Sequence, residues 1–97
     1  MTDKDLISCI EVFNKVVKLN KLLYGLFETK GEYPFQEEYN CQGILYDLII
    51  FNTIFPNGQE EFPFEEGERM CDEFAEIMFN DILSAEHKLT LIKQIKK

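Results

Sequence analysis

The sequence predicts an all-α fold, a small single-domain bundle of about four helices formed by residues 1–97. Apolar residues recur with the 3.6-residue period of an amphipathic helix in three separate segments. The prolines lie between those segments, where they interrupt regular structure. A chain of 97 residues with nine Phe and four Tyr is long enough for one core and one domain. The alternative is an α+β fold with a short buried strand or hairpin around Ile44–Phe55.

The first helix is expected from about Asp3 to Tyr24 or slightly beyond. Thr2, followed three residues later by Asp5, resembles the capping box that begins many helices. Lysines fill one face of this segment, and apolar residues four or three apart fill the other: Leu6, Ile10, Phe13 and Val17. Asn20 interrupts the apolar face, and a polar residue in such a place can fix the register of paired helices. A homodimer through this helix is therefore one hypothesis that the sequence raises.

The second segment, from Phe35 to Phe55, has an ambiguous pattern. Its apolar residues repeat at the helical spacing 3-4-3-4, at Cys41, Ile44, Leu48, Phe51 and Phe55. Yet the stretch from Ile44 to Phe51 is apolar nearly all round and rich in β-forming residues, which also suits a buried strand. The length of the pattern favours a buried helix, and Pro34 is well placed in its first turn.

Two further helices are expected after a turn at Phe55–Gly58 and an irregular stretch over Gln59–Gly67. The third helix is expected from about Glu65 to Leu83, with Met70, Phe74 and Met78 on its apolar face. Ser84 is a candidate N-cap for a fourth helix. The apolar face of that helix is formed by Ala85, Leu89, Ile92 and Ile95.

Charge is strongly segregated along this chain of net charge −8. Residues 28–83 contain 14 acids against Lys30 and Arg69, whereas the segments on either side carry a small excess of lysine. A negative surface repels nucleic acid and anionic lipid and attracts basic protein. The sequence therefore predicts a basic protein as partner, with no direct binding to nucleic acid or to a membrane.

The predicted partner-binding residues are the acids of the third helix region and the aromatic residues among them. They are Glu60, Glu61, Phe62, Phe64, Glu65, Glu66, Glu68, Asp72, Glu73 and Glu76. On a helix that begins near Glu61, five of these acids share one face at about 5–6 Å intervals, close to the spacing of phosphates along a DNA strand. A secondary binding segment is predicted at Tyr33, Phe35, Glu37 and Glu38. Two alternatives stay open: the acids form only a solvated surface, and the aromatic rings fold back onto the core.

No motif in the sequence predicts chemistry. Cys9, Cys41 and Cys71 are far apart and lie on apolar faces, so buried, unreactive thiols are expected. His87 is the single histidine, and Ser84, the nearby hydroxyl, is better used as a helix cap. There is no phosphate-binding loop, dinucleotide motif or calcium loop. We therefore expect no catalytic residue, no metal site, no cofactor and no enzymatic activity.

The start of the chain is acidic and lacks the apolar segment of a signal peptide, so a cytoplasmic protein is expected. Ten Ile against two Ala suggest AT-rich coding, which suits a phage or a mobile element. The leading functional hypothesis is a small protein-binding inhibitor whose carboxylates occupy the basic site of a nuclease or another nucleic-acid-binding protein. In strategy alone, this is similar to the DNA-mimicking inhibitors of phages and to bacterial immunity proteins. The alternative is an oligomerisation or accessory subunit that binds through apolar helix faces, with acids that serve solubility only.

Overall fold

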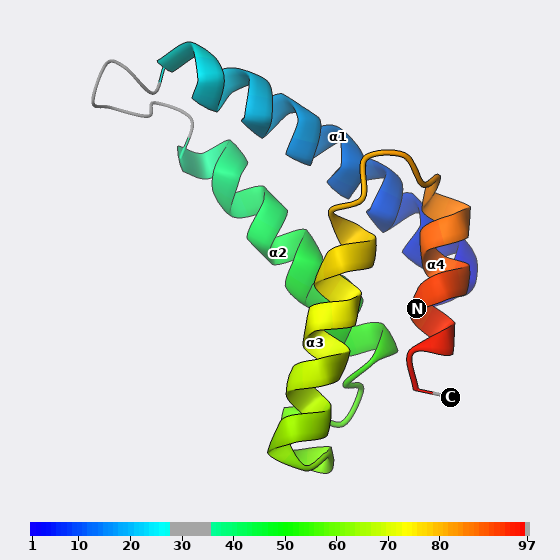
Figure 1. Ribbon diagram of the computed structural model, residues 1–97. Coiled ribbons are helices and arrows are strands. Elements are labelled where there is room, and N and C mark those ends of the chain that lie inside the picture. Colours follow the sequence, from blue (N-terminus) through cyan, green and yellow to red (C-terminus); the bar gives the residue numbers. More distant parts are fainter. Residues whose placement is uncertain (28–35, 97) are drawn as a thin grey trace.

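The computed structural model describes residues 1–27 and 36–96, except the side chain of Glu38, and it is an all-α bundle (Figure 1). The elements are α1 (Asp3–Phe27), α2 (Gln36–Thr53), the short 3-10 helix η2 (Gln59–Glu61), α3 (Phe64–Met78) and α4 (Ala85–Gln94). No strand occurs in these two described ranges. The predicted bundle of about four helices is therefore confirmed, and the alternative with a strand around Ile44–Phe55 is wrong.

Helix α1 begins at the predicted capping box. The amide of Asp5 donates to Oγ1 of Thr2 at 3.2 Å, and the amide of Thr2 donates to Oδ2 of Asp5 at 3.3 Å. These reciprocal bonds satisfy amides that have no partner within the helix. The helix continues through Gly25 to Phe27, slightly beyond the predicted end.

Helix α2 confirms the predicted helix but not its expected burial. Ile49 and Ile50 are buried, whereas Ile44 is 66% exposed and Leu48 and Phe51 are also exposed. The physical reason is that α2 has neighbours on only part of its circumference. It packs along α1, and the ring of Tyr46 meets Phe74 of α3, so its remaining side faces solvent. The predicted role of Pro34 in the first turn lies outside the described residues.

The connection from α2 to α3 is more regular than the sequence indicates. The predicted turn is present: the amide of Gly58 donates to the carbonyl of Phe55 at 3.0 Å, and Gly58 has a φ of 93° that favours glycine. The expectation of irregular structure over Gln59–Gly67 is wrong in part, since η2 begins at Gln59 and α3 at Phe64. Two acids in the first turn of α3, Glu65 and Glu66, suit the positive end of the helix dipole.

Helix α3 ends at Met78 and not at Leu83 as predicted. After it, the side-chain oxygen of Asn80 accepts hydrogen bonds from the amides of Ile82 and Leu83, at 2.8 and 3.1 Å. Such local bonds to an Asn side chain compete with the helix and stabilise a turn. Ser84 then caps α4 as predicted, because its Oγ accepts from the amide of His87 at 3.2 Å.

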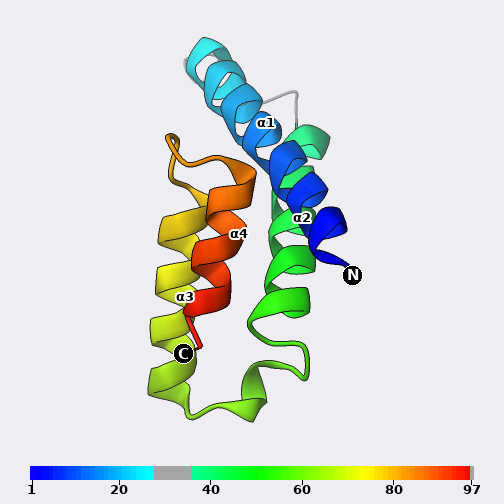
Figure 2. The same ribbon diagram turned by 90° about the vertical axis from the view of Figure 1, so that its right-hand side faces the viewer.

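All four helices, together with the turn after α2, contribute to one hydrophobic core (Figure 2). Aromatic contacts extend from the core toward its surface: Tyr46 meets the ring of the buried Phe74 edge-on at 5.0 Å, and the exposed Phe79 meets that of the buried Phe13 at 5.4 Å. The largest fully buried side chains are Phe13, Phe55, Phe74, Ile10, Ile49, Ile54, Met70, Met78 and Ile92. The predicted apolar faces of α1, α3 and α4 are the faces that line this core.

Asn20 is buried inside the bundle, between α1 and α2. Its Nδ2 donates to Oε1 of Gln42 at 3.0 Å. The side chain thus pairs two helices of the same chain, so Asn20 itself does not support the predicted homodimer through α1, which stays a prediction. A search of the described residues finds no helix that is long and apolar enough to cross a membrane.

Candidate partner-binding face on helix α3

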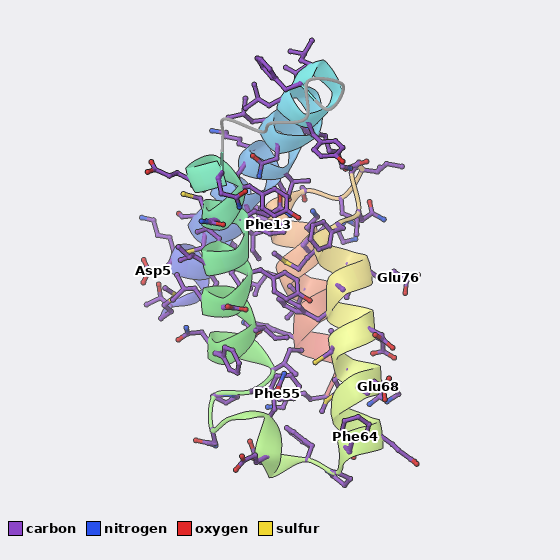
Figure 3. The ribbon with its side chains drawn as sticks, turned by 90° about the vertical axis from the view of Figure 1, so that its left-hand side faces the viewer. Asp5, Phe13, Phe55, Phe64, Glu68 and Glu76 are labelled. Carbon is purple, nitrogen blue, oxygen red and sulfur yellow. The ribbon has the colours of Figure 1, made fainter. Side chains whose placement is uncertain are left out.

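The exposed side of α3 carries a row of four carboxylates, which we call the acidic row: Glu65, Glu68, Asp72 and Glu76. Their spacing of three, four and four residues places them on one face, opposite the buried Met70, Phe74 and Met78. In Figure 3, Glu68 and Glu76 point away from the bundle, whereas Phe13 and Phe55 lie inside it. The prediction of an exposed acidic face is therefore confirmed for these four residues.

Glu61 does not belong to this row. It lies in η2, and α3 begins three residues later along the chain, at Phe64. The prediction placed the start of the helix near Glu61, and that start is wrong because Pro63 occupies the N-cap position, with a ψ of 147° outside the helical range. Glu60 and Glu61 are exposed in η2.

None of the four carboxylates of the acidic row forms an ion pair within residues 1–27 and 36–96. Arg69, the basic residue of this region, pairs instead with the two flanking acids: its Nη1 lies 2.9 Å from Oε1 of Glu73, and its Nη2 lies 3.8 Å from Oε1 of Glu66. Both pairs follow the i,i+3 and i,i+4 spacing of a helix surface. Of the predicted acids on α3, Glu66 and Glu73 thus share one cation, whereas the acidic row forms no ion pair among the described residues.

The lysines of the C-terminal segment contact other parts of the chain. Lys93 pairs with Asp3 at the start of α1, and the ammonium of Lys96 lies 5.4 Å from the centre of the Phe62 ring. Within the described chain they do not neutralise the acidic row.

The two aromatic residues among the predicted partner-binding residues at the start of α3, Phe62 and Phe64, have different environments. Phe62 folds back: its ring meets that of Phe55 edge-on at 5.9 Å and is partly buried against the core. Phe64, the first residue of α3, is 83% exposed and stands beside the beginning of the acidic row (Figure 3). The expectation that the rings cap the core is therefore correct for Phe62 and wrong for Phe64.

Of the predicted secondary segment, Glu37 is described, and it does not lie at the acidic row. Glu37 is exposed in the first turn of α2, at the opposite end of the bundle from the start of α3 (Figure 1). Tyr33 and Phe35 lie outside the described residues, and so does the side chain of Glu38. Glu37 therefore does not share a site with the acids of α3.

Cys71 is the thiol of α3, next to Asp72 of the acidic row. Burial, and then the charge of Asp72, raises the pKa of the Cys71 thiol, so the thiol stays protonated and unreactive near neutral pH. Cys9 is half-buried like Cys71, but Cys41 is exposed, which contradicts the prediction that all three are buried. Among the described residues, no cluster of three His, Cys, Asp or Glu side chains is arranged to hold a metal ion. The acidic row can act through charge, as a surface for a cationic partner.

Sequence reasoning missed two features. One is Lys88, which is only 2% exposed although it belongs to a run of C-terminal lysines. Its position among Ala85, Leu89 and Ile92, on the apolar face of α4, was the available signal. The other is an exposed apolar surface on α1 and α2, which the periodicity of α2 suggested would be buried.

Comparisons of this chain with protein-family models, with curated proteins and with solved structures find no match.

Proposed function

We propose that this protein is a small acidic inhibitor that binds the basic nucleic-acid-binding site of a partner protein, such as a nuclease, through the acidic row of α3. The observation that carries the proposal is the row itself: Glu65, Glu68, Asp72 and Glu76 are exposed, aligned, and in no ion pair among the described residues. Like charges at i,i+4 destabilise a helix by a few tenths of a kcal/mol per pair. A cationic partner would convert this repulsion into attraction.

The spacing of the row suits a surface that binds phosphate. Successive members are about 4.5 or 6 Å apart along the helix axis, from the rise of 1.5 Å per residue. The row is thus about 16 Å long, which corresponds to roughly three or four phosphates of one DNA strand. Lysine and arginine side chains arranged for such a strand can pair with these carboxylates.

Phe64 supplies an apolar contact at the end of the row. A large exposed aromatic ring next to charged groups is typical of an interface anchor, since its burial contributes affinity while the charges orient the partner. In this mechanism the carboxylates raise the association rate, and burial of Phe64 slows dissociation. The protein would act by competition with nucleic acid and would not need catalysis or a cofactor.

The double variant Glu68→Gln/Asp72→Asn tests the proposal, because it removes the two central charges of the row. Its control is Glu11→Gln/Glu86→Gln, which changes the net charge equally on exposed positions of α1 and α4. Immobilised wild-type chain should retain basic nucleic-acid-binding proteins from its host at low salt, and added DNA duplex should release them. The row variant should lose this retention and the control variant should keep it.

Retained proteins that resist salt and DNA, and that bind the row variant as well as the wild type, would contradict the proposal. The free row variant should meanwhile be slightly more stable than the wild type, by a few tenths of a kcal/mol per relieved pair. Thermal unfolding measures this change in parallel.

A second candidate function, a structural or accessory subunit that binds through apolar helix faces, is favoured by one observation. Several large apolar side chains of α1 and α2 are exposed, among them Leu19, Leu22 and Ile44. Contiguous exposed apolar patches usually mark an interaction site. Binding through such a surface would depend little on salt, which separates this function from the first.

A further inference from the structure

Exposed apolar side chains of α1 and α2 lie on one side of this helix pair, which we call the hairpin face. On α1 it consists of Val12, Leu19, Leu22 and Leu26, and on α2 of Cys41, Ile44 and Leu48, all exposed. Successive residues of an α-helix are rotated by about 100° about its axis, and on each helix these positions fall within about 100° of one another. They lie to one side of the line along which α1 and α2 meet. That line is marked by Asn20 and Gln42, whose side chains are bonded at 3.0 Å.

The hairpin face points away from α3 and α4. On α1, the side chains that reach α4 and the loop before it lie on another side: Asn14 accepts a hydrogen bond from Lys88, and Lys21 pairs with Asp81. On α2, the side chain that meets α3 is Tyr46, whose ring lies 5.0 Å from that of Phe74. The apolar surface is therefore remote from the acidic row, and the strong negative charge of α3 does not oppose association there.

The exposed sides of α1 and α2 carry charges of opposite sign at the same level. At about 100° per residue, Lys15 falls between Leu26 and Leu22 on α1, and Asp47 lies beyond Ile44 at the outer edge of α2; both are exposed. Asn20 and Gln42 fix the register of the two antiparallel helices. Lys15 precedes Asn20 by five residues and Asp47 follows Gln42 by five, so each lies about 7.5 Å along the same direction. Neither takes part in an ion pair within the described ranges.

We propose that the hairpin face binds a second copy of this chain about a twofold axis parallel to α1 and α2. This axis places α1 of one copy over α2 of the other. Residues at the same height along the helices in one copy therefore stay at that height in the other. Lys15 of each copy then meets Asp47 of the other, and the twofold symmetry forms this pair twice in the dimer. A twofold axis across the helices would instead place α1 on α1 and remove the contact between Lys15 and Asp47.

The size of the face is consistent with a weak dimer. From Val12 to Leu26 the face is about 21 Å long, and two helices packed side by side are about 20 Å wide. The contact is thus on the order of 400–500 Å² per copy, near the lower limit for specific association. We expect a dissociation constant in the micromolar range or weaker. The inference supplies a partner for the second candidate function and does not depend on the role of the acidic row.

Charge reversal with sedimentation velocity tests the dimer and its axis together. The full chain is measured over a dilution series at low ionic strength, with reducing agent present because Cys41 is exposed. Wild-type protein should dimerise, and Lys15→Glu and Asp47→Lys should each weaken dimerisation about tenfold, since two pairs become repulsive. An equal mixture of the two variants should associate again, because both contacts in the mixed dimer join opposite charges.

An apolar variant and its control test the surface. Ile44→Ser should weaken dimerisation more than tenfold, because the side chain is lost from both copies. Ile82→Ser is the matched control: Ile82 is 92% exposed but lies in the loop after α3, so its loss should leave the dimer unchanged. Circular dichroism confirms that each variant is folded.

Wild-type protein that stays monomeric throughout the dilution series would overturn the proposal. A dimer that Asp47→Lys leaves unchanged would overturn the proposed axis, and one that Ile44→Ser leaves unchanged would overturn the surface. The row variant Glu68→Gln/Asp72→Asn should dimerise like wild type. A protein that dimerises but retains no partner would thus contradict only the proposal for the acidic row. A protein that retains a partner but stays monomeric would contradict only the proposal for the hairpin face.

Discussion

The ammonium group of Lys88, on α4, donates a hydrogen bond of 2.6 Å to the carbonyl oxygen of Met78, the last residue of α3. The same group donates to Oδ1 of Asn14 on α1, also at 2.6 Å. One buried side chain therefore joins three helices and satisfies a carbonyl at a helix end, where the helix itself provides no donor. Burial lowers the pKa of Lys88, and the nearby charge of Asp81 acts in the opposite direction.

The first prediction concerns Lys88→Met, which keeps the length of the side chain and removes its donors. We expect the free energy of unfolding to fall by about 1–3 kcal/mol, because the Met78 carbonyl and the Asn14 amide lose a buried partner. Relief of the desolvation of a buried charge acts in the opposite direction. Urea unfolding measures the balance. A variant more stable than the wild type would show that burial of the charge outweighs the two hydrogen bonds.

The second prediction concerns Tyr46 at alkaline pH. Burial is the main cause that raises the pKa of Tyr46 above 10.0 in the folded protein. Above pH 10.0 the unfolded chain therefore loses this proton first, and stability falls as the pH rises further. Tyr46→Phe should lose less stability than the wild type between about pH 8 and pH 11. Lys88, with its lowered pKa, acts in the opposite direction in both proteins, so the difference between them isolates Tyr46. Equal losses would contradict the prediction.

The third prediction compares the two aromatic residues before the acidic row. Phe62→Ala should lower stability by about 1–2 kcal/mol, because Phe62 packs on Phe55 and is only partly buried. Phe64→Ala should change stability by less than about 0.5 kcal/mol, because its ring is almost wholly exposed. Thermal unfolding of the two variants gives the comparison. If Phe64 is an interface anchor, Phe64→Ala should also speed dissociation of a retained partner, and unchanged dissociation would rule out that role.

The fourth prediction concerns the helix caps. Ser84→Ala should destabilise the protein by about 1 kcal/mol, within the usual range of 0.5–2, because the His87 amide loses its acceptor. Ser84→Asn should retain most of the stability, since Asn is an equally good cap. Denaturant unfolding of the two variants, Ser84→Ala and Ser84→Asn, shows whether the loss of stability comes from the missing capping group or from any change of the Ser84 side chain. An Asn variant as unstable as the Ala variant would argue against capping.

Local signals in the sequence predicted local structure well. The bonds at Thr2–Asp5 and at Ser84 join residues three positions apart, so sequence spacing contains nearly all the information that they need. The acidic row was also predictable, because helical spacing fixes which residues share a face. Its beginning was placed too early, since the extended conformation of Pro63 separates Glu61 from α3.

Burial in α2 was not predictable in the same way. The apolar spacing of Ile44 and Leu48 is compatible with a core face, but whether a helix face is covered depends on how many neighbours it has. Four helices of this length leave one side of α2 without a neighbour. Lys88 is the converse case: its lysine identity suggested the surface, whereas its place on the apolar face of α4 determined its burial.

The two sides of α3 use separate sets of residues: Met70, Phe74 and Met78 hold the helix in the bundle, and the acidic row faces outward. Mutations can therefore accumulate in the row, one codon at a time, with little effect on folding. A protein built in this way can follow a changing target across generations while its scaffold is inherited intact. If the acidic row binds the proposed partner and that partner evolves to escape, α3 is the helix where we expect related chains to diverge fastest.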